Sequence, residues 1–310
     1  MSAPRLTRRL LRLPRLTPAR ALPRTLSPLL HRFSSTSSAA AEPQRLGQPH
    51  PSTHPHLLAP TDLTPHLTPL HYALRRAQFA SHLLPNSLAI LPSHEILYRS
   101  GPVFHDFHQH PDFYYLTGFL EPSSVCIIEK NDEHVGGDHI FHLFCRDKDA
   151  HAELWDGART GIKNAEDVFG ADRAHDVEAL SRVLPRLVEG KDAVYTDVDF
   201  LSRKGGWVVE KAGQRMKDAL EGVQRLPVKN MMHQLRIIKS GEEAKIMRET
   251  GKKSGRAYNR AFMREWKSEH ELAAYLEYWF KRNGCEKSAY VPVVAGGKVP
   301  HPSYPRLPPC

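Results

Sequence analysis

The chain has 310 residues and a formal net charge of +9, with 40% hydrophobic and 25% charged residues. This length is enough for two domains, and no apolar run approaches the roughly 18 residues that a membrane-spanning helix needs. The positive charge is concentrated in residues 1–41, which hold eight of the 43 basic residues and none of the 34 acidic ones. The remainder is nearly neutral, which excludes a general attraction to phosphate backbones and argues against a nucleic acid partner.

Residues 1–41 are rich in arginine, leucine and serine, a composition typical of a mitochondrial presequence. The arginines alternate with leucines in a pattern that favours an amphipathic basic helix, although Pro14 and Pro18 interrupt it. The stretch "HRFSSTSS" resembles a processing junction, with cleavage expected just after Phe33. The alternative is a basic tail without a targeting function. We predict mitochondrial localisation.

Residues 42–67 mix proline, histidine, threonine and glutamine without hydrophobic periodicity, which predicts a disordered linker. The histidines are separated by prolines on a chain that we expect to be flexible. Ordering them around a metal ion would carry a large entropic cost, so we expect no metal site in this segment.

Residues 68–230 are predicted to form an α/β domain. A helix is expected to start at the cap Thr68 with Pro69 in its first turn, and to end at Pro85-Asn86. Apolar, β-prone runs and a second helical pattern then alternate along the chain: "LAIL" (88–91), "FYYLTGF", "SSVCIIE", "HIFHLFC", the helical pattern at 177–188, and "AVYTDV" (193–198). This alternation favours a sheet with flanking helices.

Two longer helices are predicted in residues 231–298. Each begins with the pattern of a capping box, Ser240 with Glu243 and Ser268 with Glu271. "YVPVVAGG" is then typical of a buried strand and a tight turn, and it is followed by a proline-rich tail over residues 299–310. Proline lacks the amide proton that a central strand needs. Two helices and one strand cannot bury a core of their own, so we expect exposed apolar helix faces here.

Five residues that suggest thiol or metal chemistry have structural explanations. Cys126 and Cys145 lie in apolar stretches and are expected to be inert buried thiols. His105, His108 and His110 lie close together in sequence and suggest a metal site, but positions in a loop or at a strand edge are the favoured interpretation. We assign no catalytic residue and no metal ligand, and the substrate-binding residues stay unknown.

The tryptophan, aspartate and arginine of "ELWDGARTG" are another candidate group. We interpret Trp155, Asp156 and Arg159 as a turn stabilised by a carboxylate and an indole. Carboxylates in the first turns of the two longer helices are interpreted as caps that complement the helix dipole: Glu242, Glu243, Glu269 and Glu271.

Four stretches, in order along residues 71–298, resemble the aminopeptidase P (X-Pro aminopeptidase) family, in particular its mitochondrial, intermediate-cleaving type. "HPDFYYLTGFLEPSSVCIIEK" and "ELWDGARTGIKNAEDVFGAD" resemble its N-terminal domain, which has a creatinase-like fold with a mixed sheet and flanking helices. "LRIIKSGEEAKIMRETGKKSGRAY" and "YVPVVAGGK" resemble the first helix and first strand of its pita-bread catalytic domain. One departure is His108, where the family usually has arginine before the glutamine.

The resemblance implies a metallopeptidase in which two divalent cations, usually manganese, activate a shared water. Their ligands in the family are two Asp, one His and two Glu, which follow the Gly-Gly strand. Here Lys298 leads instead into the proline-rich tail, and His301 lies too early to be the family's histidine. We interpret the tail as aberrant sequence from a frameshift, a retained intron or alternative splicing, so we expect a truncated, inactive chain that binds no metal. A genuine short isoform is the alternative.

Two functions therefore remain open. The first is the N-terminal part of a manganese-dependent aminopeptidase that acts on the N-termini of peptides or imported proteins. The second is a non-catalytic binding or assembly module, because the resemblance implies that the N-terminal domain takes part in homo-oligomer contacts. A metal-free peptide-binding relative is the weakest candidate, since it would need the complete pita-bread domain.

Overall fold

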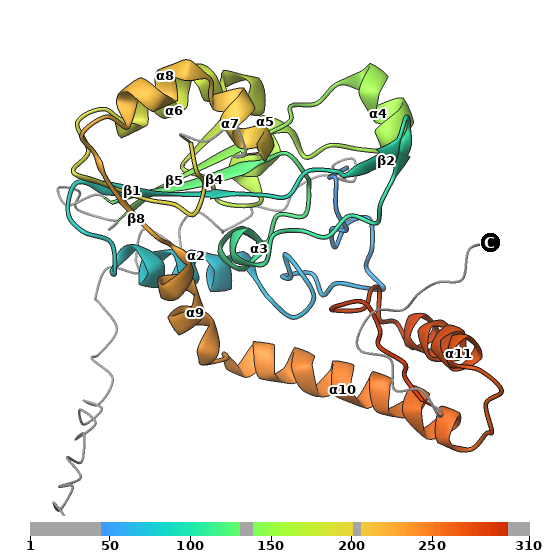
Figure 1. Ribbon diagram of the computed structural model, residues 1–310. Coiled ribbons are helices and arrows are strands. Elements are labelled where there is room, and N and C mark those ends of the chain that lie inside the picture. Colours follow the sequence, from blue (N-terminus) through green and yellow to red (C-terminus); the bar gives the residue numbers. More distant parts are fainter. Residues whose placement is uncertain (1–44, 131–138, 201–205, 297–310) are drawn as a thin grey trace, which may run out of the picture.

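The structure, a computed structural model, describes residues 45–130, 139–200 and 206–296. Its centre is a mixed six-stranded sheet with the strand order β6-β5-β4-β1-β7-β8 (Figure 1). The strands of this sheet are β1 (Ser87–Pro92), β4 (Val125–Lys130), β5 (His139–Cys145), β6 (Arg173–Asp176), β7 (Ala193–Tyr195) and β8 (Gln224–Leu226). The predicted α/β domain with a mixed sheet and flanking helices is confirmed.

The direction of the strands changes across β1. Strand β1 pairs antiparallel with β4, with Ile90 opposite Ile127, and parallel with β7, with Leu88 opposite Val194. The pair β7–β8 is also parallel. All of these apolar residues are buried, because both faces of the central strands are covered and the strands consist of nearly continuous hydrophobic runs.

Two hydrophobic clusters cover the two faces of the sheet. One face packs against α2 (Pro69–Ala80), α3 (Pro111–Thr117) and α5 (Gly161–Asp167), and its core includes Tyr72, Phe79, Phe113 and Phe141. The other face packs against α6, α7 and α8, as Figure 1 shows above the sheet. These three helices have the bounds Leu180–Val188, Gly206–Ala212 and Gln214–Ala219, and the 3₁₀ turn Val177–Ala179 precedes the first of them.

Residues 45–67 pack onto the sheet domain, which differs from the disordered linker that we expected. Leu46, Leu58, Leu63 and Leu67 are buried, although the segment contains no regular helix. The buried side chain of Gln48 donates to the carbonyl of Gly118 and accepts from the amide of Leu120. Leucines spaced irregularly along a series of turns leave no period, so the sequence pattern did not reveal them.

The first helix begins as predicted and ends earlier. Thr68 caps α2 in a capping box with His71, and Pro69 occupies its first turn. The helix stops at Ala80 because the side chains of Ser81 and His82 both donate to the carbonyl of Gln78, 2.7 Å away in each case. These bonds compete with the continuation of the helical ladder.

The run "FYYLTGF" was predicted to be β-prone and this was wrong, because residues 111–117 form the helix α3. His110 is its cap, Pro111 occupies its first turn, and Gly118 ends it in the left-handed region with φ 68°. The start at His110 and Pro111 and the stop at Gly118 outweighed the intrinsic preference of the aromatic residues between them for β-strands.

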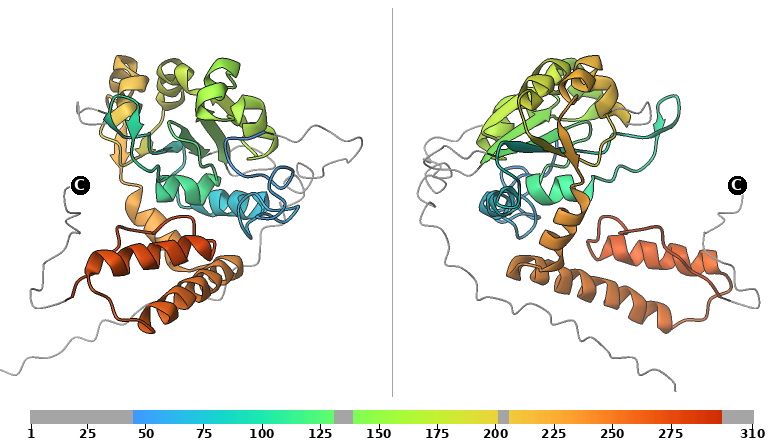
Figure 2. Two further views of the ribbon diagram at one scale, coloured as in Figure 1. Left: turned by 90° about the vertical axis from the view of Figure 1, so that its right-hand side faces the viewer. Right: turned by 60° about the vertical axis from the view of Figure 1, so that its left-hand side comes forward.

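The elements not anticipated from the sequence are short. They include a hairpin of β2 (Tyr98–Ser100) and β3 (Val103–Phe104), which projects away from the main sheet (Figure 2), and the helix α4 (Ala150–Asp156). The strand β6 and the helices α5, α7 and α8 were likewise not predicted.

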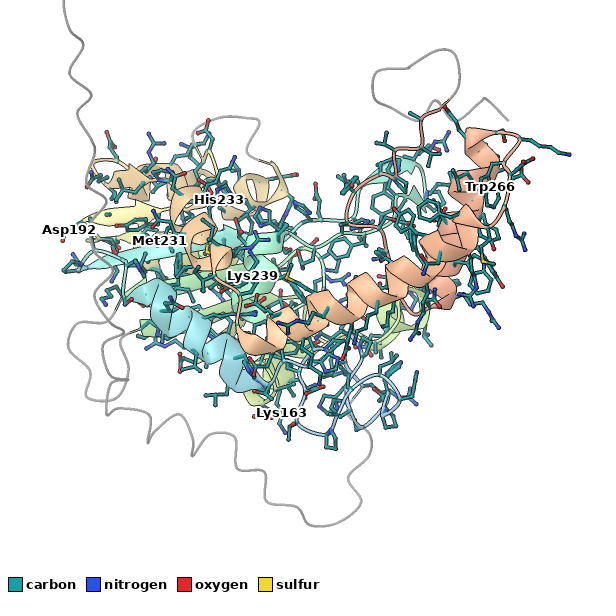
Figure 3. All side chains as sticks on the ribbon, turned by 90° about the horizontal axis from the view of Figure 1, so that it is seen from below. Lys163, Asp192, Met231, His233, Lys239 and Trp266 are labelled. Atoms are coloured by element: carbon teal, nitrogen blue, oxygen red, sulfur yellow. The ribbon has the colours of Figure 1, made fainter. Side chains whose placement is uncertain are left out.

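Three further helices form an arm below the sheet domain, here called the helical arm: α9 (Lys229–Ile237), α10 (Gly241–Phe262) and α11 (Glu269–Arg282). Figure 3 shows Met231 and His233 on α9, Lys239 just before α10, and Trp266 between α10 and α11. The apolar helix faces that were expected to be exposed are partly covered: Leu276 is 92% buried between α10 and α11 with Ala257 and Ala261, and Ile246 and Leu272 are partly buried. Met247, Phe262 and Met263 of the arm are exposed instead.

The strand expected around Val291 is not formed. Residues 291–296 have no regular structure, and Val291 and Val293 are exposed. The amide of Gly296 donates to the side chain of Glu269 at 2.7 Å rather than to a strand. Within the described ranges no strand runs beside this segment, and a strand without a partner is not stable. The predicted leader (1–41) and the tail after Lys298 lie outside the described residues.

Candidate functional site

A cavity of about 670 Å³ lies at the carboxyl ends of β1 and β7. The two strands are parallel, so they end at the same edge of the sheet, and the chain then leaves them toward the β2–β3 hairpin and toward α7. Crevices outside the carboxyl ends of strands are the usual ligand sites of open α/β sheets. The residues that line this cavity are Pro92, Ser93, His94, Glu95, Leu97, His105, Asp106, Phe107, His108, Asp197, Val198, Asp199, Trp207 and Val208.

Hydrogen bonds from three parts of the chain hold the cavity together. The indole N–H of Trp207 on α7 donates to the carbonyl of Ser93 at 3.3 Å. The Nδ1 of His94 donates to the carbonyl of His108 at 2.8 Å, and the amide of His94 donates to the side chain of Gln109 at 3.0 Å. The same Gln109 donates to the carbonyl of Glu121, 2.9 Å away. These bonds tie together the backbone segments that border the cavity.

The histidines of the "HDFHQH" segment have two different roles. His110 caps α3 by accepting from the amide of Phe113, and its ring meets that of His94 edge-on at 5.1 Å. Burial lowers the pKa of His110, which favours the neutral, accepting form that a cap needs. His105 and His108 line the cavity, and all three histidines lie outside the helices and strands, as the loop interpretation predicted.

The carboxylates and the tryptophan on the far side of the cavity were not found by sequence reasoning. Asp197 and Asp199 follow β7, and Trp207 lies on α7, about a hundred positions after His94. The parallel pairing of β1 with β7 is what brings these segments together. "AVYTDVD" did show a strand followed by acidic residues, which is the local pattern that could have identified this edge.

The group Trp155, Asp156 and Arg159 is only partly the stabilised turn that we expected. The guanidinium of Arg159 lies 3.8 Å from the carboxylate of Asp156 and donates to the carbonyl of Asp147. The indole of Trp155 is 82% exposed and contributes no packing to this turn.

The glutamates of the helical arm act as caps and as links to other segments. Ser240 and Glu243 form the predicted capping box on α10. Ser268 accepts from the amide of Glu271, but the carboxylate of Glu271 accepts from Lys267 instead of completing the box. The structural interpretation of these carboxylates is confirmed for α10 and needs this one change for α11.

The thiols of Cys126 and Cys145 are buried, as predicted. Burial raises the pKa of the Cys126 thiol to about 12, and it raises the pKa of Cys145 as well. A thiol is a nucleophile only as its thiolate, so neither residue is suited to nucleophilic chemistry near neutral pH.

No group of three or more His, Cys, Asp or Glu side chains among residues 45–130, 139–200 and 206–296 is arranged to hold a metal ion. The residues around the cavity are acidic and imidazole-bearing, but they do not converge on one point. This part of the chain therefore does not fit a two-cation hydrolytic centre, and we derive no metal-dependent step from it. No helix of the same part is long and apolar enough to cross a membrane.

Comparison with known proteins shows what the sheet domain and the helical arm are similar to. Residues 72–195 match the family model described as "Aminopeptidase P, N-terminal domain". Intermediate cleaving peptidase 55 of Saccharomyces cerevisiae is 35% identical over 282 residues, which are 88% of this chain and 55% of that protein. The crystal structure of that protein superposes with a TM-score of 0.65 over 76% of this chain and 52% of the other.

Two further relatives widen the comparison. Intermediate cleaving peptidase 55, mitochondrial, of Arabidopsis thaliana is 30% identical over 254 residues, 81% of this chain and 49% of that protein. A zinc-substituted aminopeptidase P of Escherichia coli, in complex with product, is 26% identical with a TM-score of 0.62, covering 70% of this chain and 50% of that one. The chain spans about half the length of the curated relatives that it matches.

Proposed function

Because the chain belongs to the aminopeptidase P family, we propose that it is the N-terminal part of a mitochondrial metallopeptidase that removes an amino-terminal residue from peptides or imported proteins. The observation that carries this proposal is the 35% identity to a yeast intermediate cleaving peptidase across both the sheet domain and the helical arm. The mitochondrial name of the Arabidopsis relative and the basic leader support the compartment.

The cation of the complete enzyme is manganese in this proposal, with two ions bound by oxygen-rich ligands. The described residues do not supply those ligands. Residues 45–296 would therefore help to position the peptide and would provide a surface for neighbouring protein. The chain on its own is expected to bind no stoichiometric manganese and to hydrolyse no X-Pro peptide.

Mass spectrometry of mitochondrial protein N-termini tests the function in cells. Disruption of the gene should leave a set of imported proteins with one additional N-terminal residue, and re-expression of the complete gene should remove it. Unchanged N-termini would overturn the proposal. N-terminal sequencing of the organelle form of this protein should start at Ser34, whereas an intact Met1 would contradict mitochondrial processing.

A second function, that of a binding or assembly module, is favoured by the β2–β3 hairpin. Four apolar residues of this projecting hairpin are exposed: Leu97, Tyr98, Val103 and Phe104. Exposed apolar patches of this kind often mark protein contacts. Analytical ultracentrifugation of the purified chain, with and without Tyr98→Ser and Phe104→Ser, would show whether a homo-oligomer forms through this surface.

A further inference from the structure

We propose that the cavity at the carboxyl ends of β1 and β7 binds an organic cation with a guanidinium head on an apolar stem, the chemistry of an arginine side chain. The cavity is built from the segment after β1, the irregular segment between the β2–β3 hairpin and α3, the segment after β7, and α7. Its volume of about 670 Å³ lies in the range typical of small-molecule sites, roughly 300–1,000 Å³.

The charge of the lining selects a cation. Three acidic residues that take part in the charge argument line the cavity, Glu95, Asp106 and Asp197, and no lysine or arginine is among the described lining residues. None of the ion pairs between described residues involves Glu95, Asp106 or Asp197, although Asp197 accepts from the amide of Val228. A cleft lined by charge of one sign focuses its potential and concentrates the opposite ion.

The walls of the cavity select an organic ion over a metal ion. Trp207 and Phe107 supply aromatic surface, and Leu97 and Val208 supply aliphatic surface. The indole of Trp207 is fixed by its bond to Ser93. The carboxylates and imidazoles of the described lining do not form a metal-holding group, so the negative charge is spread around the cavity rather than focused on one point.

A guanidinium suits this combination better than an ammonium. Its flat, weakly hydrated face stacks on aromatic rings while its five N–H groups reach carboxylates in its plane. The cavity offers both kinds of surface to one head group. An ammonium is a compact and strongly hydrated charge and would use only the carboxylates.

One cation from the segment after α11, Lys287, contacts the backbone at the edge of the cavity but does not line it. The Nζ of Lys287 donates to the backbone carbonyl of Phe107 at 2.6 Å and lies 3.4 Å from the carboxylate of Glu286. This bond fixes the backbone of one wall. It therefore connects the segment after α11 to the shape of the cavity.

The test is titration of the purified full chain with Nα-acetyl-L-arginine methylamide, followed by calorimetry and by the NMR resonance of the Trp207 indole N–H, assigned with Trp207→Phe. The neutral analogue Nα-acetyl-L-citrulline methylamide and the lysine analogue are the comparison ligands. We expect saturable binding of the arginine probe, and binding at least about tenfold weaker for both analogues. Binding of citrulline within twofold of arginine, binding of lysine as tight as arginine, or no saturable arginine binding in the millimolar range would each overturn the proposal.

Variants then locate the site. The double variant Glu95→Gln and Asp106→Asn should weaken the arginine probe by about tenfold or more, while Glu210→Gln, an exposed carboxylate on α7 outside the lining, should leave it unchanged. Equal losses in both, or no loss in the double variant, would contradict the proposal. Unchanged thermal unfolding of the variants confirms that they fold. Free L-arginine distinguishes the source of the ligand: tighter binding of the blocked probe supports an arginine within a peptide, and equal binding supports the side chain alone.

Discussion

The guanidinium of Arg75 on α2 lies 3.1 Å from the carboxylate of Glu243 on α10, and this pair joins the sheet domain to the helical arm. Both side chains are largely buried, with exposed fractions of 10% and 20%. Arg75 also lies over the ring of Tyr115 and donates to the carbonyl of the same residue. Arg75 is therefore one of the contacts that hold α10 against α2, and the pair His71–Glu242 at 3.4 Å is another.

We predict that Arg75→Met lowers the free energy of unfolding by about 2 kcal/mol, because it leaves Glu243 partly buried without its partner. A double-mutant cycle with Glu243→Gln, measured by urea unfolding, should give a coupling energy of about 1 kcal/mol. Glu249→Gln is the matched control, since its partner His66 and Glu249 itself are both more than a third exposed. Additive effects of the first two changes would show that the pair does not join the two parts.

The second prediction concerns the segment before α2. Leu63 is 97% buried in the core below the sheet, and Leu57 is 54% exposed. Leu63→Ala should lower the free energy of unfolding by about 2–4 kcal/mol because it removes buried methyl groups and leaves a cavity. Leu57→Ala should change it by less than about 0.5 kcal/mol. Denaturant unfolding of both variants gives the comparison, and equal small effects would restore the interpretation of residues 45–67 as a linker.

The third prediction uses two glycines with positive φ. Gly118 has φ 68°, and a Cβ there would lie 2.8 Å from the ring of Tyr72, whereas Gly101 has φ 50° and open space around it. Gly101→Ala should cost about 1 kcal/mol for the backbone alone. Gly118→Ala should cost clearly more, about 3 kcal/mol, because Tyr72 is fully buried and cannot move away. Equal melting temperatures of the two variants would contradict the close approach of α3 to α2.

The fourth prediction is a pH dependence. Hydrogen bonds from His142 and Lys191 lower the pKa of Glu129 to about 2, against the opposing effect of burial. Because the folded form holds the carboxylate ionised more strongly than the unfolded form does, its stabilising contribution is complete above about pH 4.5 and is lost as the pH falls toward 2.

Glu129→Gln should therefore destabilise the chain most near pH 6, with a difference from the unmodified chain that shrinks between pH 4.5 and the acid limit. Thermal unfolding at several pH values measures this difference. Glu178→Gln, which removes a more exposed partner of Lys211, serves as the control. A difference that stays constant across this range would show that the carboxylate does not titrate as described.

Elements with local start and stop residues were predictable from the sequence. Thr68-Pro69 and Ser240 with Glu243 start α2 and α10 because the cap is made within one turn. The strand β1 and the strands of "SSVCIIE" and "HIFHLFC" were found because they are continuous apolar runs. Helix α3 was missed because its caps lie outside the β-prone run that they control.

The candidate cavity was not predictable in the same way. Ser93 and Trp207 become neighbours only through the parallel pairing of β1 with β7, and the packing of residues 45–67 depends on single leucines. Non-local pairing leaves no period in either segment. The resemblance to a family identified the domain, but it did not identify this edge of the sheet as a site.

The pairing of β1 on both sides has a consequence for how the chain acquires its fold. Ser87 of β1 must find Ala193 of β7, whereas the antiparallel partner β4 emerges much earlier from a ribosome or an import channel. The edge of β1 that later receives β7 is therefore exposed while α4, α5 and α6 are still being delivered, and an unpaired apolar edge invites wrong association. Delivery from the N-terminus therefore leaves one edge of β1 without its partner strand until residue 195 has arrived.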